Sequence, residues 1–226
     1  MNENRSDGES CVDPTEIDTG STIVPDSPEQ RLSVTRERLM KIEGLDVRAA
    51  LNEASNIISK SIHADKLDIL FYEPAIDSLV LMSACLTPLA KRQKTLGMDR
   101  FPLANGGLSA CIYLSEESYM TGHADQDPEV LRGIKGALGI RSVIGVPLYV
   151  AGELRGVVRV DSQKVDAFTE SDLHFMEQIA GWVGIVIYKV ELMQKVHKET
   201  DKDAKHAAIE ELATIIALEF DNYLSV

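Results

Sequence analysis

Two neighbouring runs of β-forming residues constrain the fold of this chain more than any other feature of its sequence. The runs are 142–150 (SVIGVPLYV) and 154–161 (LRGVVRVD), and only Ala151, Gly152 and Glu153 separate them. A short glycine-containing loop between two strand-like runs is typical of an antiparallel hairpin. The chain is therefore expected to contain an antiparallel sheet, and the remaining helices and strands are expected to pack against this sheet or to extend it.

Helix-start signals precede and follow this hairpin. Ser27 before Pro28 predicts an N-terminal helix over 27–43, because a hydroxyl can cap free N–H groups and proline suits the first helical position. Asp46 can cap a second helix, and Thr169 with Asp172 can cap a last, long one. The second helix has an apolar stripe at helical spacing, formed by Val47, Ala50, Leu51, Ala54, Ile57 and Ile58.

The residues between these helices predict a mixed arrangement. Residues 67–72 and 79–85 read as paired strands around a turn, and 119–121 as a short strand. Short helices are expected over 106–114 and from a cap at Asp127 to about 138. This order predicts an α+β fold, with a central antiparallel sheet, flanking helices and a long C-terminal helix.

Charge and composition exclude several functions. The formal charge of −13 disfavours nucleic acid, and no apolar run is long enough to insert into a membrane, so we expect a cytoplasmic protein. Residues 1–26 hold seven acidic residues against one arginine and predict a disordered acidic tail. The cysteines, Cys11, Cys85 and Cys111, are scattered singly, which argues against a structural metal site.

The hairpin and the residues around it resemble the GAF domain, a small-molecule sensing module of signalling proteins. The matching sequences are 142–162 (SVIGVPLYVAGELRGVVRVDS), 167–180 (AFTESDLHFMEQIA) and 106–122 (GGLSACIYLSEESYMTG), and the predicted domain covers 44–190. The resemblance implies a pocket on one face of the sheet for a small-molecule ligand, and it names no cofactor. The implied pocket wall is Leu108, Cys111, His123, Leu131, Ile134, Arg141, Val143 and Arg159. A filled pocket in a dimerising scaffold is the alternative.

A possible metal site in this region has a simpler explanation. His123, Asp125 and Asp127 alternate, so in an extended segment they would face one side. Asp127 before Pro128 is better explained as a helix cap, and we therefore predict no metal site. Arg141 and Arg159 are candidate partners for an anion inside the pocket.

The long last helix predicts a homodimer. Its residues 179–187 are apolar nearly all round, so the helix needs a second partner besides its own sheet. A parallel pairing with the same helix of a second copy would supply that partner. The predicted seam, at alternating steps of three and four, is Met176, Ile179, Val183, Val186, Val190 and Met193.

Residues 191–226 resemble a coiled coil that leads into the dimerisation helix of sensor histidine kinases. Glu219, Phe220, Asn222 and Leu224 match the motif His-Glu-Phe/Leu-x-Asn-x-Leu, but Leu218 stands in place of the phosphoacceptor histidine. Leucine has no nucleophilic atom, so no phosphorylation is expected there. The degenerate acceptor site is thus Leu218, Glu219 and Asn222, and the sequence holds no ATP-binding domain.

These observations predict a non-catalytic, dimeric regulatory module of two-component-type signal transduction. Ligand or partner binding would be transmitted through the C-terminal helix, and a heterodimer with a related histidine kinase is a further possibility. One alternative is a sensor fragment of an active kinase whose catalytic part is supplied elsewhere. Another is a GAF-fold redox enzyme using Cys85 or Cys111.

Overall fold

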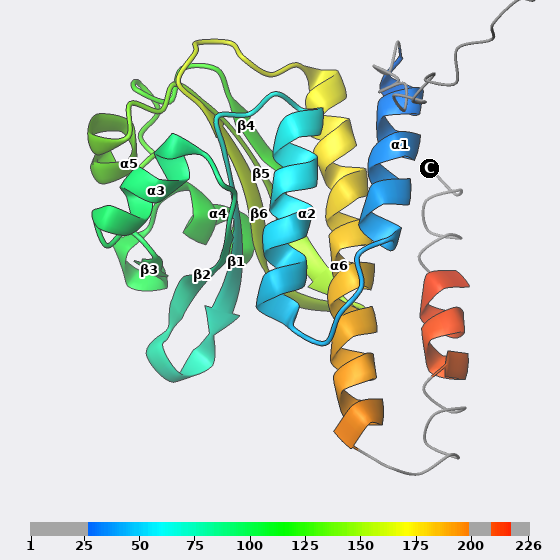
Figure 1. The fold of residues 1–226 in the computed structure, drawn as a ribbon. Helices are drawn as coiled ribbons and strands as arrows, with labels where there is room; N and C mark the ends of the chain where they lie inside the picture. Colours follow the sequence, from blue (N-terminus) through cyan, green and yellow to red (C-terminus); the bar gives the residue numbers. More distant parts are fainter. Residues whose placement is uncertain (1–26, 199–208, 218–226) are drawn as a thin grey trace, which may run out of the picture.

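The computed structural model describes residues 27–198 and 209–217. An antiparallel six-stranded sheet with the order β3-β2-β1-β6-β5-β4 forms its centre (Figure 1). The predicted hairpin is the β5–β6 pair. The strands are β1 Lys66–Glu73, β2 Ser78–Ala84, β3 Arg100–Pro102, β4 Tyr119–Thr121, β5 Ser142–Val150 and β6 Glu153–Ser162.

Helices cover both faces of the sheet (Figure 1). One face carries the long helices α1 Pro28–Met40, α2 Val47–Ser61 and α6 Glu170–Lys198. The other face carries the short helices α3 Pro88–Thr95, α4 Leu108–Ser115 and α5 Arg132–Ala137, with 3₁₀ turns at Pro74–Ile76 and Leu103–Asn105. Each side has its own apolar cluster, so successive residues of β1 and β6 point into different cores. The predicted α+β fold is confirmed.

Local capping chemistry sets the starts of the three long helices. The Ser27 hydroxyl accepts the N–H of Gln30 at 3.2 Å, and Asp46 accepts the N–H of Ala49 at 2.9 Å. At α6, the Thr169 hydroxyl accepts the N–H of Asp172, while the Asp172 carboxylate accepts the Thr169 N–H at 2.8 Å. This reciprocal pair is the capping box that the sequence predicted.

Residues 179–187 of helix α6 are apolar nearly all round, and the chain itself covers this helix on two sides. It packs on β5 with one side and on α1 and α2 with the other. At the α1 contact, Arg31 pairs with Asp172 at 2.7 Å and stacks over the Phe175 ring. Lys189 donates to the carbonyls of Met40 and Ile42 at the end of α1.

This packing places most of the predicted dimer seam inside the core of the chain itself. Five of its six residues are at most 1% exposed and lie in the core of the chain itself: Met176, Ile179, Val183, Val186 and Val190. Those five side chains are not accessible to a second copy while this fold is kept. Met193 is the exception, with 49% of its surface exposed.

Three features differ from the elements expected between the strands. Helix α3 and strand β3 were not predicted, although Thr87 caps α3 through its hydroxyl and Pro88 occupies the first helical position. Helix α5 begins at Arg132 rather than after Asp127. The Asp127 carboxylate instead accepts the N–H of Glu129 at 2.9 Å, two residues further along the chain, which forms an Asx turn.

The described part of the C-terminal segment is a helix over 209–217. Its Leu212, Ile215 and Ile216 are half-buried against the α1–α2–α6 cluster. The expected acidic tail 1–26 and the degenerate acceptor residues Leu218, Glu219 and Asn222 lie outside the described residues. Within 27–198 and 209–217, no helix combines the length and the apolar character that a membrane crossing requires.

Candidate functional site

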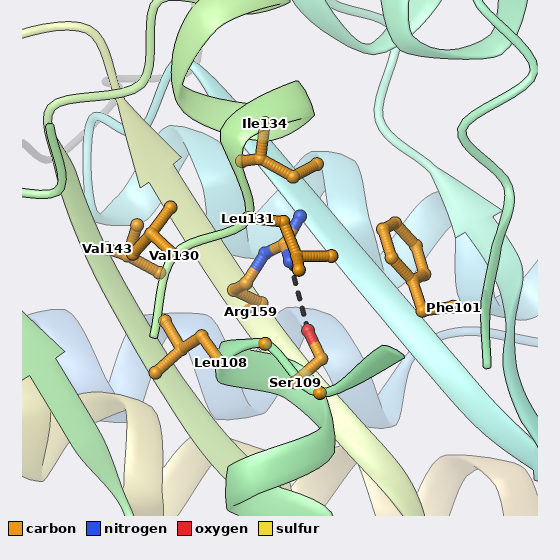
Figure 2. A pocket seen from close by; sticks show the side chains of 10 residues that line it. Phe101, Leu108, Ser109, Val130, Leu131, Ile134, Val143 and Arg159 are labelled. Carbon is orange, nitrogen blue, oxygen red and sulfur yellow. Dashed lines mark hydrogen bonds between the residues drawn. The ribbon is translucent and has the colours of Figure 1, made fainter. Parts of the chain in front are cut away.

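A small cavity lies between the sheet and the short helices, on the face opposite α6. Its volume is about 10 Å³, which is about the space that one water molecule needs. Figure 2 shows Arg159 in the middle of it, with Ser109 on one side of the guanidinium and Ile134 on the other. The lining residues are Phe101, Gly106, Gly107, Leu108, Ser109, Val130, Leu131, Ile134, Val143 and Arg159.

Five of the eight residues predicted for the pocket wall line this cavity: Leu108, Leu131, Ile134, Val143 and Arg159. The other three lie elsewhere. Cys111 is on the exposed side of α4, His123 is exposed and pairs with Asp166, and Arg141 forms a surface ion pair with Asp125 at 2.7 Å. Two lining residues that were not predicted, Val130 and Ser109, are adjacent in the sequence to the predicted residues Leu131 and Leu108. Phe101 belongs to the strand β3, which the sequence did not reveal.

A square of four charged residues lies behind the cavity, at the centre of the sheet. Asp68 of β1 is the cross-strand neighbour of Arg159 of β6, and Lys66 is the neighbour of Asp161. Arg159 Nη2 is 3.0 Å from Asp68 Oδ2, and Arg159 Nε is 3.1 Å from Asp161 Oδ1. Lys66 Nζ contacts both carboxylates. Each charge therefore has an opposite charge across the strands and another along its own strand.

The four side chains are at most 4% exposed, so their charges depend on one another. Burial raises the pKa of the Asp68 carboxyl, but the positive charges of Lys66 and Arg159 lower it by more. The pKa of Asp68 therefore lies below its usual value. Burial lowers the pKa of the Arg159 guanidinium, but Asp161 and Asp68 raise it above its usual range. The square thus pairs two basic side chains with two acidic ones, each in contact with both groups of opposite charge.

Two polar residues extend this square towards the short helices. Gln93 of α3 donates to Asp68 Oδ2 at 3.1 Å, and Arg159 Nη1 donates to the Ser109 hydroxyl of α4 at 3.0 Å (Figure 2). Within this network, several buried atoms of the described residues have no hydrogen-bond partner: Asp68 Oδ1, Gln93 Oε1, Arg159 Nε and both carboxylate oxygens of Asp161. Sequence reasoning missed this network because lysine and aspartate in a strand are usually solvent-facing.

The described cysteines do not form a joint reactive site. Cys85 is buried in the cluster of the long helices, whereas Cys111 is exposed on α4, on the other side of the sheet. The Cys111 thiol donates to Glu129 Oε2 at 3.2 Å, and this hydrogen bond raises the pKa of the thiol, with burial and the Glu129 charge adding to the effect. A catalytic thiol needs the opposite shift.

The metal interpretation of 123–127 was set aside on the sequence, and the structure shows three separate partners there. His123 pairs with Asp166, Asp125 with Arg141, and Asp127 accepts from the Tyr119 hydroxyl at 3.0 Å. No group of three or more potential ligands that could hold a metal ion occurs among the residues that the structure describes.

Solved structures with the same fold come from several kinds of protein. The chain is similar to the free methionine-R-sulfoxide reductase of Neisseria meningitidis, with a TM-score of 0.59, 19% identity and coverage of 73% of this chain and 89% of that one. It is also similar to the GAF domain of a phosphoenolpyruvate-protein phosphotransferase from Coxiella burnetii, with a TM-score of 0.60, 18% identity and coverage of 72% and 93%. At these identities the likeness concerns the fold.

A third similar structure covers residues 122 to 287 of a methyl-accepting chemotaxis protein, with a TM-score of 0.56, 21% identity and coverage of 71% and 98%. A comparison with curated protein sequences gave no significant match. The model of the GAF domain matches residues 46–187, which is more than half of the chain. The chain therefore belongs to the GAF domain family.

Proposed function

We propose that this protein is a non-catalytic regulatory module of two-component-type signal transduction. A small molecule or a partner changes the cavity wall on one side of the sheet, and the change reaches α6 on the other side. The protein acts as a homodimer, and a related histidine kinase is a candidate heterodimer partner. The regulatory role agrees with the family, whose solved relatives include a domain from a chemotaxis protein.

The observation that carries the proposal is the double role of β5. Val143 lines the cavity, whereas Val146, Leu148 and Val150 of the same strand belong to the cluster around α6. The contact with α6 is tight, since a Cβ atom built on Gly184 would lie 2.1 Å from the Tyr149 carbonyl oxygen. A displacement of β5 at the cavity must therefore be accommodated by α6.

This coupling can be tested by hydrogen exchange without knowing the natural ligand. Leu131→Trp enlarges a side chain of the cavity wall and mimics an occupied cavity. We expect altered exchange rates at the α6 amides that face β5. The matched control is Leu114→Trp, at an exposed position of α4 outside the cavity lining. Equal α6 exchange in both variants would contradict the coupling.

For the homodimer, we propose the end of the helix layer near the C-terminus of α6. Met193 and Leu45 are 49% and 44% exposed there, and the Leu45 carbonyl accepts a hydrogen bond from Gln194. Light scattering should give a dimer for the full chain and a larger share of monomer for Met193→Glu. Leu114→Glu, on the opposite layer, is the control that should leave the dimer intact. A monomeric full chain at high concentration would rule out this part of the proposal.

A further inference from the structure

The charges beside the cavity determine which ligands it can accept. Lys66 and Arg159 carry two positive charges, Asp68 and Asp161 carry two negative ones, and all four groups are in contact. Their sum is zero. Because Arg159 lines the cavity, any ligand there lies directly against this buried and balanced square.

A charged ligand would disturb that balance. A carboxylate beside Arg159 would leave one excess negative charge next to four side chains that are at most 4% exposed, and an ammonium ion would leave one excess positive charge. Burying an uncompensated charge is far more costly than burying a neutral polar group that keeps one hydrogen bond. The arrangement therefore disfavours ions of both signs, although an arginine in a pocket is usually taken as an anion site.

Arg159 still has hydrogen-bonding capacity for a neutral ligand. A guanidinium carries five N–H bonds. Among the described residues, the Ser109 hydroxyl accepts one N–H bond of Arg159 Nη1 and the Asp68 carboxylate accepts one of Nη2. The Nε atom lies 3.1 Å from Asp161 Oδ1 in an ion pair without a hydrogen bond. One N–H bond on each terminal nitrogen is left, and a carbonyl or hydroxyl oxygen of a ligand can accept it.

The remaining walls of the cavity are apolar and fit the body of such a ligand. Phe101, Leu108, Val130, Leu131, Ile134 and Val143 surround the guanidinium (Figure 2). At about 10 Å³ the cavity admits no more than one water, so a larger molecule must displace part of the wall.

The wall formed by Leu131 and α5 is the part that can move at the lowest cost. Helix α5 has six residues, and its only buried one is Ile134. Leu131 is half-buried and packs on Gly107, where a Cβ atom would lie 2.6 Å from Leu131 Cγ. A short displacement of α5 makes room for a few carbon atoms, and the sheet and the charged square stay in place.

We propose that this cavity binds a small uncharged molecule with an apolar body and one hydrogen-bond acceptor, which Arg159 recognises, and that it rejects carboxylates and ammonium ions. The inference rests on the proposed function in one respect, since it takes the cavity as the ligand site. It adds the chemical class of the ligand.

Three probes of the same size and different charge test the proposal: butyramide, butyrate and butylammonium. Binding to the full chain is followed by NMR of the methyl groups of Leu131, Ile134 and Val143. We expect butyramide to bind at least about tenfold more tightly than either ion, as the cost of an unpaired buried charge requires. The proposal would be overturned if the wild-type protein bound butyrate or butylammonium with an affinity equal to that for butyramide. It would also be overturned if none of the three probes bound.

Charge substitutions in the square make the test specific. Asp68→Asn gives the square a net positive charge, and butyrate should then bind at least about tenfold more tightly than it binds the wild type. Asp161→Asn makes the same change from the other carboxylate, so either variant serves if the other does not fold. Lys66→Met gives the opposite sign and should favour butylammonium. The matched control is Asp125→Asn, which removes a surface carboxylate and should leave the order of the probes unchanged.

The result separates this inference from the proposed function. Butyramide binding without any change in α6 hydrogen exchange would contradict signal transmission and leave the ligand class standing. A response of α6 to butyrate in the wild type would support transmission and overturn the ligand class. Asp68→Asn and Asp161→Asn variants that fold, yet bind butyrate no better than the wild type, would also overturn it.

Discussion

Asp68 and Arg159 lie directly opposite each other on β1 and β6, and Asp68 Oδ2 is 3.0 Å from Arg159 Nη2, with both side chains buried. Both residues have a second partner of opposite charge, so the pair is one side of a closed square. A buried charge without its partner is costly, whereas a buried neutral pair is tolerated. Stability should therefore depend on the balance of charges more than on any single contact.

Loss of one member of this pair should be worse than loss of both. Arg159→Met leaves Asp68 and Asp161 with only Lys66, and we expect it to lower the free energy of unfolding by about 3–5 kcal/mol. The double variant Asp68→Leu/Arg159→Met keeps the charges balanced and should lose less than Arg159→Met alone. Urea unfolding monitored by circular dichroism measures both.

The control for these variants is Arg141→Met, which breaks the exposed pair with Asp125 and should cost about 1 kcal/mol or less. A double variant that is less stable than Arg159→Met would mean that the hydrogen bonds of the square, and not its charge balance, dominate.

The sequence predicts the fold well where the signals are local. The hairpin loop at Gly152 and the caps at Ser27, Asp46 and Thr169 depend on a few neighbouring residues, and all are found. The sequence indicated that the long last helix needs two partners, and it assigned the second side to a second copy of the chain. In the structure α1 and α2 cover that side. The contribution of α1 was hard to recognise because most of its residues are polar and only Thr35 and Leu39 are buried.

The candidate site was predictable only in part, for a physical reason. Lys66 and Asp68 alternate with apolar residues, a pattern typical of a strand with one face in water. Here the short helices cover that face as well, and the charges are stable because residues about 90 positions away in the sequence neutralise them. Pairing over such a separation leaves no signal in a single sequence.

Gly184 should be required for the contact between α6 and β5. A Cβ atom at this position would lie 2.1 Å from the Tyr149 carbonyl oxygen, and backbone on both sides prevents a small adjustment. Gly184→Ala should lower the free energy of unfolding by about 1–3 kcal/mol, even though alanine favours the helix.

Gly136→Ala in α5 is the control, because nothing lies within 4 Å of its Cβ position. That variant should be neutral or up to about 1 kcal/mol more stable. Equal effects at both positions, measured by urea unfolding, would argue against the close contact.

Stability should fall in acid, and Asp172 should contribute to the fall. Burial raises the pKa of its carboxyl, but hydrogen bonds from Thr169 and Arg31 lower it more, so the pKa in the folded protein is below that in the unfolded chain. The unfolded state then binds protons first, and the stabilisation is present at neutral pH and lost as the pH falls below about 4. Asp68 acts in the same direction.

The contribution of Asp172 can be isolated by comparing unfolding curves at pH 7 and pH 3. Asp172→Asn should be less stable than the wild type at pH 7. The difference should shrink at pH 3, because the Asp172 carboxyl of the unfolded chain is then largely protonated and part of the stabilisation by the ionised carboxyl is lost. Because Asp172 is only partly buried, solvent screening keeps the effect small, about 1 kcal/mol or less. A difference that stays constant with pH would show that Asp172 stabilises the helix start without its charge.

The Cys111 thiol should react slowly with alkylating reagents. Its hydrogen bond to Glu129 raises the thiol pKa, and only the thiolate is nucleophilic. Glu129→Gln removes the negative charge, so the alkylation rate of Cys111 with iodoacetamide at pH 8 should rise at least about twofold, as judged by peptide mass spectrometry. Glu117→Gln changes an exposed carboxylate that is not among the groups acting on the Cys111 thiol, and it should leave the rate unchanged. The same result bears on redox chemistry, since a thiol held protonated by a carboxylate is the reverse of an activated one. A wild-type Cys111 that alkylates faster than in Glu129→Gln would contradict this and restore a reductase as a candidate function.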